Sequence, residues 1–286
     1  MLRRSLLFLS ERKGLRDRLL RVPAARATAH RFVAGEGLDE ALDVASGLEA
    51  RGFRVTLDHL GESVGTEGEA EAATSSYETT FARIRARGIE STISLKLTQL
   101  GLDLDRAICV SNLERILAAA DRCDSFVRID MEGSDYTEAT LDVFHQVFPR
   151  HRNVGVVIQS YLLRSERDIE DLAREGAHVR LCKGAYKEPP SLAYPRKADI
   201  DANYVHLARH LLDAARDRPA VGGVPPVGIA THDDEMIEAT RGFVESRAIP
   251  IDAFEFQMLY GVRAAYQEEL LKEGYHVRIY VPYGTE

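Results

Sequence analysis

The chain contains few cysteines and no break in composition that would divide it. Its three cysteines, Cys109, Cys123 and Cys182, are an odd number without metal-ligand spacing, which argues against a disulfide framework and against a zinc site. A reducing, cytoplasmic compartment fits this usage best. No linker rich in Pro, Gly and Ser separates the 286 residues. We therefore expect one domain, large enough for a barrel of roughly 250 residues plus an extension.

A long apolar run is also missing. No segment approaches the roughly 20 apolar residues that are needed to span a bilayer. The short run at residues 5–9 follows two arginines, but Glu11, Arg12 and Lys13 interrupt it at once. It is therefore shorter than the core of a signal peptide.

Acidic residues are scarce at the amino-terminal end and abundant elsewhere. Residues 1–31 contain nine Lys/Arg and two acids, Glu11 and Asp17, which gives this segment a net charge of +7. Because the whole chain has a net charge of −8, the remaining residues carry −15. One interpretation is a basic amphipathic arm that contacts the anionic inner membrane peripherally. The other is a helical arm over residues 1–50 that packs on a catalytic body at 51–286. A nucleic-acid role is not expected, because the body is acidic and its basic residues are not interleaved with aromatic ones.

Eight short apolar segments alternate with helical patterns along the chain. We expect strands at 53–60, 91–97, 126–132, 153–161, 178–186, 226–233, 253–261 and 276–284, with amphipathic stretches between them. A strand-then-helix repeat favours a parallel sheet with helices outside, and eight units favour a closed (β/α)8 barrel. No helix follows the eighth strand before Glu286. We expect either that an amino-terminal helix covers that strand or that a last helix is missing.

Polar residues gather where these strands end, which is the end at which barrels of this kind do their chemistry. They are Lys96, Asp130, Gln159, Arg180, Lys183, Thr231, His232, Gln257 and Tyr280. Lys96 stands between leucines, and a buried lysine needs a carboxylate partner, from the protein or from a ligand. Thr231 and His232, followed by two aspartates, could bind a metal or could hydrogen-bond a cofactor; no other strand end adds a ligand cluster, so we expect no metal. The long loop after the fifth strand is either a substrate lid or an ordinary exposed loop.

The strings at the strand ends together resemble those of the proline dehydrogenases, FAD-dependent barrel enzymes that occur alone in bacteria and as a domain of the proline utilisation A proteins. The matching strings start at Ser94, Ile129, Val157, Val179, Ala230, Glu255 and Val277, and they cover strands two to eight in order. Any one string is weak. Seven in register are specific.

The resemblance implies a role for each matching residue. Asp130 and Arg180 would be catalytic, Arg180 beside the flavin, while Lys96, Leu259 and Tyr280 would bind the substrate. The residues that would contact FAD are Met131, Gln159, Arg180, Lys183, Gly184, Ala185, Thr231 and His232. A cation beside the flavin would stabilise the negative charge that arrives with a hydride.

The implied activity is oxidation of L-proline to 1-pyrroline-5-carboxylate, with the electrons passed to a membrane quinone. The chain departs from the family pattern in one respect, because it ends before the helix whose two arginines clamp the substrate carboxylate; we expect the sequence to continue into such a helix. Two other functions stay open from the residues. One is a flavin-free aldolase or isomerase that uses Lys96 as its reactive amine. The other is a flavin-binding remnant without activity on proline.

Overall fold

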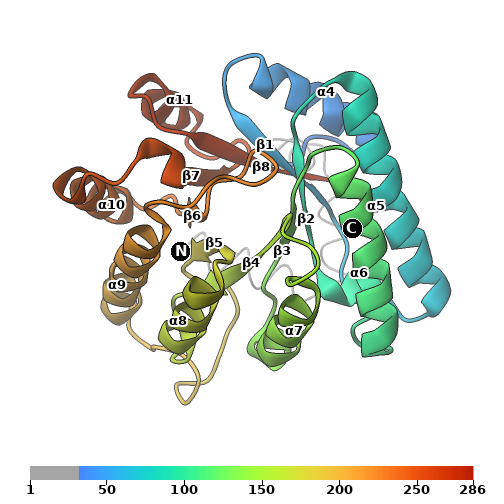
Figure 1. Ribbon diagram of the computed structural model, residues 1–286, viewed down its shortest axis with the longest axis horizontal. Coiled ribbons are helices and arrows are strands. Elements are labelled where there is room, and N and C mark those ends of the chain that lie inside the picture. Colours follow the sequence, from blue (N-terminus) through green and yellow to red (C-terminus); the bar gives the residue numbers. More distant parts are fainter. Residues whose placement is uncertain (1–31, 286) are drawn as a thin grey trace, which may run out of the picture.

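The computed structural model describes residues 32–285, and these form a closed barrel of eight parallel strands in sequential order. Figure 1 shows the strands at the centre and the helices arranged around them. The strands are β1 (Arg54–His59), β2 (Thr92–Leu95), β3 (Val127–Ile129), β4 (Val154–Gln159), β5 (His178–Cys182), β6 (Val227–Ala230), β7 (Phe254–Leu259) and β8 (Val277–Tyr283). Pairing of β8 with β1, which aligns Thr56 with Tyr280, closes the ring. The barrel predicted from the sequence is therefore confirmed.

Each strand leads into a helix outside the barrel, except β8 within the described chain. The helices are α4 (Leu38–Glu49), α5 (Glu67–Arg87), α6 (Arg106–Asp121), α7 (Ser134–Val147), α8 (Ser165–Glu175), α9 (Lys197–Ala215), α10 (Asp234–Arg247) and α11 (Ala264–Lys272), with short 3-10 turns η1 (Leu97–Leu100) and η2 (Ile251–Ala253). Their apolar faces and the almost wholly buried strands form one continuous core. Burial on both faces explains why the strands read as apolar runs.

Helix α5 illustrates how local sequence sets the element boundaries. Thr66 accepts a hydrogen bond from the Glu69 amide, and Glu69 reaches back to the Thr66 amide, which forms a capping box at the start of the helix. The helix ends at Gly88, whose φ of +66° is the left-handed conformation that glycine adopts without strain. Local sequence therefore sets both ends of this helix.

Helix α4 packs beside the closure of the barrel. It contacts β1 and β8, and its buried face consists of Ala41, Leu42, Ala45 and Leu48. The segment before it runs along β8, where the Ala34 amide donates to the Pro282 carbonyl. A helix that precedes β1 thus covers β8. The basic arm predicted at residues 1–31 lies outside the described residues, and the division at residue 50 stays a prediction.

Several strands end earlier than the sequence patterns predicted. β5 stops at Cys182 and β6 at Ala230, so Lys183, Thr231 and His232 stand on the loops that follow. The pairing of β5 with β6 ends at the level of Leu181 and Ile229. Gly184, with a φ of +106°, then turns the chain away. The polar residues are still at the carboxyl end of the barrel, but loop backbone carries them.

Candidate active site

Asp130 is the centre of the polar cluster at the carboxyl end of the barrel. Its Oδ1 accepts a hydrogen bond of 2.7 Å from the Arg180 guanidinium, and its Oδ2 accepts one of 2.7 Å from the Tyr280 hydroxyl. Asp130 follows β3, Arg180 is on β5 and Tyr280 is on β8, so the cluster joins strands from opposite parts of the ring. Burial and the nearby Asp130 carboxylate raise the pKa of Tyr280 well above its usual range. Tyr280 is therefore a protonated donor at neutral pH.

Four contacts fix the Arg180 guanidinium. Besides Asp130, it donates to Ser94 at 3.0 Å and to Gln257 at 2.5 Å. Its central carbon lies 5.2 Å from the centre of the Tyr280 ring, within the range of a cation–π interaction. Arg180 is 6% exposed. A positive charge is thus held rigidly at the mouth of the barrel.

Below Arg180, an ion-pair network fills the interior of the barrel. Gln257 donates to Glu255 at 2.6 Å, and Glu255 accepts from Arg278 at 2.6 Å and from Arg54 at 3.1 Å. Burial opposes ionisation of Glu255, but attraction and hydrogen bonding by Arg278 outweigh it and lower its pKa. The guanidinium at the site is therefore supported from below by a satisfied network. Only Gln257 in this network stood out from the sequence.

The carboxylate partner of Lys96 is Asp58, a residue that was not predicted from the sequence. The Lys96 amino group lies 4.0 Å from Asp58 Oδ1. Burial favours the neutral amine, yet the carboxylates of Asp58 and Asp130 outweigh it, so the pKa of Lys96 is raised. Asp58 stands at the end of the first apolar strand, and an acid in a strand buried on both faces was the signal that could have revealed it.

Gln159 presents an unused acceptor at the carboxyl end of β4. Its amide nitrogen donates to the Met131 carbonyl at 3.0 Å. Its Oε1 is buried and has no partner among the described residues. An unpaired buried acceptor is costly unless a ligand or water satisfies it. Gln159 and Met131 thus form a site for an N–H donor.

His232 presents an unused donor near β6. Its Nε2 accepts the Leu259 amide at 3.3 Å, so in the neutral ring the proton is on Nδ1. That Nδ1 is buried and has no partner within residues 32–285. Burial and the nearby Arg263 lower the pKa of His232, which keeps the ring neutral. Thr231 is used locally, since its hydroxyl accepts the Asp233 amide at 3.1 Å.

Gly184 stands where the chain passes close to an aromatic ring. A Cβ built on it would clash with the ring of Tyr161, and its φ of +106° disfavours any other residue. The next residue, Ala185, is exposed. Glycine at this position therefore lets the loop after β5 pack directly against the Tyr161 ring.

Lys183 is held by two acids at this point in the structure. Its amino group pairs with Asp201 and, at 2.7 Å, with Asp233. Lys197 pairs with the same two acids. A lysine predicted to face the cofactor therefore points to a cluster that begins α9 and α10, so its predicted role requires exchange of these partners.

The long loop after β5 is tied to neighbouring loops. Glu188 accepts hydrogen bonds from the Ser134 amide at 2.8 Å and from the Tyr161 hydroxyl at 3.4 Å. The Tyr194 amide donates to the Tyr161 carbonyl at 2.8 Å.

Among the residues predicted to contact the substrate, Leu259 is 44% exposed and so offers an open apolar surface at the end of β7.

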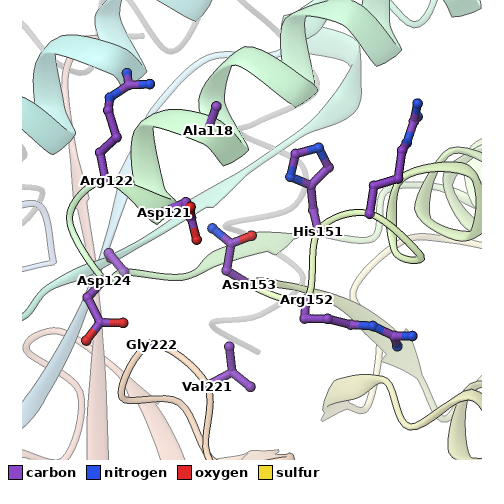
Figure 2. Close-up of a pocket in the computed structure, with 11 residues that line it drawn as sticks. Ala118, Asp121, Arg122, Asp124, His151, Arg152, Asn153, Val221 and Gly222 are labelled. Carbon is purple, nitrogen blue, oxygen red and sulfur yellow. The ribbon is translucent and has the colours of Figure 1, made fainter.

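A cavity in the described chain lies elsewhere. It measures about 480 Å³ and lies at the amino-terminal end of the barrel, where α6 and α7 lead into β3 and β4. Figure 2 shows Arg122, His151, Arg152 and Asp124 around it, with Val221 and Gly222 on one side. None of the predicted site residues lines it. The candidate site is therefore identified by the convergence of polar groups at the opposite end of the barrel, and not by this cavity.

Residues 32–285 contain neither a candidate metal site nor a candidate membrane span. No group of three or more His, Cys, Asp or Glu is arranged to hold a metal ion. None of the helices in that part is long and apolar enough to cross a membrane.

The chain matches known proteins along nearly its whole length. The family model described as proline dehydrogenase matches residues 41–286. Proline dehydrogenase 2 of Bacillus subtilis is 38% identical over 280 residues, which cover 98% of this chain and 89% of the relative. Proline dehydrogenase of Deinococcus radiodurans is 36% identical over 263 residues, covering 90% and 82%.

A solved structure agrees with the fold. Proline utilization A from Bdellovibrio bacteriovorus, inactivated by N-propargylglycine, superposes with a TM-score of 0.83 at 26% identity. The match covers 92% of this chain and 31% of that one, so the chain spans about a third of that larger protein. With the family model and two relatives above 30% identity over most of their length, the chain belongs to the proline dehydrogenase family of oxidoreductases.

Proposed function

We propose that this protein oxidises L-proline to 1-pyrroline-5-carboxylate with FAD as its bound cofactor. Family membership supports proline as the substrate. The observation that carries the proposal is the Arg180 cation, fixed by Asp130 and Gln257, together with two buried groups at the same end of the barrel that lack partners within residues 32–285, Gln159 Oε1 and His232 Nδ1. Flavin, when bound, supplies the two-electron acceptor that no amino-acid side chain provides.

The residues at the site fit a flavin. Gln159 Oε1 would accept an N–H of the ring system, and His232 Nδ1 would donate to one of its acceptors or to the ribityl chain. Gly184 and Ala185 would provide backbone that a flat ring can approach, with Met131 alongside. Thr231 and Lys183 would hold more distant parts of the cofactor, Lys183 after releasing Asp201 or Asp233.

The reaction needs stabilisation of negative charge near the cofactor and a fixed substrate. Arg180 would provide the charge stabilisation, because its guanidinium is already oriented by Asp130, and preorganised charge requires no rearrangement during the reaction. Lys96 would bind the substrate carboxylate. Tyr280 and the exposed Leu259 would form the walls of the pocket and exclude water from the substrate ring.

The flavin-free alternative is disfavoured by the charge on Lys96. A Schiff-base or general-base lysine must be neutral, and such lysines have lowered pKa values. The carboxylates around Lys96 raise its pKa instead. A charged lysine suits a carboxylate-binding role.

The test is spectroscopic. Protein purified under non-denaturing conditions should be yellow with flavin absorbance, heat should release the flavin, and anaerobic proline should bleach it. Colourless protein that stays colourless after incubation with FAD would contradict the cofactor. Flavin that proline does not bleach would support the inactive remnant instead.

A quinone in the membrane is the electron acceptor that we propose, with the protein in the cytoplasm and in peripheral contact with the membrane. Proline-reduced protein should reduce a soluble ubiquinone analogue. Vesicles containing anionic lipid should sediment the protein, and vesicles of neutral lipid should not.

A further inference from the structure

Asp58 has an acceptor atom that no group in residues 32–285 uses. It is 3% exposed, and its Oδ1 is buried without a hydrogen-bond partner among the described residues. The nearest cation, the Lys96 amino group, lies 4.0 Å away, beyond hydrogen-bonding distance. A buried carboxylate oxygen left in this state is costly. It therefore points to a donor supplied by a ligand.

Three other groups at this end of the barrel are unsuited to act as the base. Both oxygens of Asp130 accept hydrogen bonds, from Arg180 and from Tyr280. Lys96 has a raised pKa and stays protonated. The accepting nitrogen of His232 is taken by the Leu259 amide.

We propose that Asp58 binds the ring ammonium of the substrate and accepts its proton as the substrate is oxidised. This inference rests on the function proposed above. Lys96 would hold the carboxylate of the amino acid, and Asp58 lies beside Lys96, so the two ends of a zwitterion would face groups of opposite charge. A secondary ammonium has two N–H donors, and Asp58 Oδ1 is an acceptor without a partner in the described chain.

The proton transfer completes the balance of the reaction. One N–H bond of the ammonium breaks, and its proton goes to Asp58 Oδ1. The electron pair left on nitrogen forms the C=N bond as the neighbouring C–H bond breaks. That hydrogen leaves as a hydride to flavin, the oxidant of the proposed function. Without loss of the proton, nitrogen has no electron pair to form the double bond.

The ionisation of Asp58 suits this role. Burial raises its pKa to about 6, against the attraction of Lys96. A base whose pKa lies near the working pH is an efficient proton acceptor. The groups that face Asp58 from the neighbouring elements are Lys96 after β2, Asp130 after β3, Arg180 on β5, Tyr280 and Tyr283 on β8, and Tyr77 on α5. Of these, the carboxylate of Asp130 raises the pKa of Asp58, while the cations Lys96 and Arg180 and the Tyr280 hydroxyl lower it.

The first experiment measures flavin reduction by proline in anaerobic stopped flow, from pH 5 to 8, for the wild type and for Asp58→Asn. In the wild type, the reduction rate constant divided by the dissociation constant should fall as acid protonates Asp58, through an apparent pKa near 6. The variant should be about 10²- to 10⁴-fold slower and should lose this acid limb. Glu132→Gln is the matched control, because this carboxylate is also buried nearby but both its oxygens are bonded to Thr98.

A second experiment measures binding without turnover. Protein whose flavin has been reduced in advance should bind proline at least tenfold more weakly when it carries Asp58→Asn. Tetrahydrofuran-2-carboxylate, with oxygen in place of the ring nitrogen, should bind the variant as well as the wild type or better. If the variant lost affinity for both ligands equally, Asp58 would act only through Lys96, and the proposal would be overturned.

The outcomes separate this inference from the proposed function. Wild-type flavin that proline does not reduce contradicts the function itself. Wild-type reduction with an unchanged rate and pH profile in Asp58→Asn overturns the role of Asp58 alone. If that variant does not fold or does not retain flavin, the wild-type profile decides, since a rate independent of pH between 5 and 8 is incompatible with a base of this kind.

Discussion

The Tyr280 hydroxyl donates a hydrogen bond of 2.7 Å to Asp130 Oδ2, and so links β8 to the loop after β3 across the mouth of the barrel. Asp130 in turn pairs with Arg180, whose guanidinium lies 5.2 Å from the centre of the Tyr280 ring. The three side chains hold one another in a closed arrangement. Changing any one of them should therefore disturb the other two.

Replacing Arg180 by Met should slow flavin reduction more than it weakens proline binding. The guanidinium interacts most strongly when negative charge has developed, so its loss should reduce the rate by about 10²- to 10³-fold. Stopped-flow reduction at several proline concentrations separates the rate from the dissociation constant. Arg209→Met, an exposed position on α9, should leave both unchanged. A variant with a normal rate and a raised dissociation constant would contradict this role.

Replacing Lys96 by Met should instead weaken carboxylate binding, by about 2–5 kcal/mol if the partner charge is left buried. Titration with tetrahydrofuran-2-carboxylate, followed by the change in flavin absorbance, measures this directly. Lys272→Met, on the exposed side of α11, is the control for loss of a lysine. Unchanged affinity in Lys96→Met would mean that other groups hold the carboxylate.

Gly184→Ala should lower the flavin content of the purified protein. The new Cβ would collide with the Tyr161 ring, and the residue would keep a strained positive φ. Gly176→Ala is a matched control, because Gly176 has a φ of +80° but nothing within 4 Å of a Cβ. It should cost roughly 1 kcal/mol of stability and leave flavin bound. Equal flavin-to-protein absorbance ratios in the two variants would disprove the close-approach argument.

Glu255→Gln should destabilise the fold strongly. The change leaves Arg278 and Arg54 without their carboxylate inside the barrel, and breaking a buried pair costs about 3–5 kcal/mol. Glu268→Gln removes a half-exposed partner of Arg51 and should cost at most about 1 kcal/mol. Urea unfolding of both variants gives the comparison. Similar midpoints would show that the interior network adds little to stability.

His178 should make the fold sensitive to acid. Burial, helped by the nearby Arg128, lowers its pKa to about 3, whereas an unfolded histidine titrates near 6.5. The unfolded state therefore binds more protons between these values, so stability is complete above pH 6.5 and falls as the pH drops toward 3. The slope is at most about 1.4 kcal/mol per pH unit. His178→Asn should flatten the dependence of the urea midpoint on pH, whereas the exposed His210→Asn should not.

The sequence by itself determined the architecture and the neighbourhood of the site. Eight apolar strands separated by amphipathic helices specify a parallel barrel, and a parallel barrel gathers its strand ends in one place. Lys96, Asp130, Arg180 and Tyr280 could therefore be predicted from the sequence. Their polarity within buried strands was itself the signal.

Tertiary structure alone decided which of these residues are in contact and which acid pairs with which cation. Tyr280 meets Asp130 because the pairing of β8 with β1 closes the ring, a contact between the two ends of the barrel that no local pattern encodes. Asp58 meets Lys96 across the neighbouring strands β1 and β2. Asp58 Oδ1, in contrast, has no hydrogen-bond partner in the described part of the chain. Charge pairing depends on distances of a few ångströms, whereas sequence patterns specify only the face and the end of each strand.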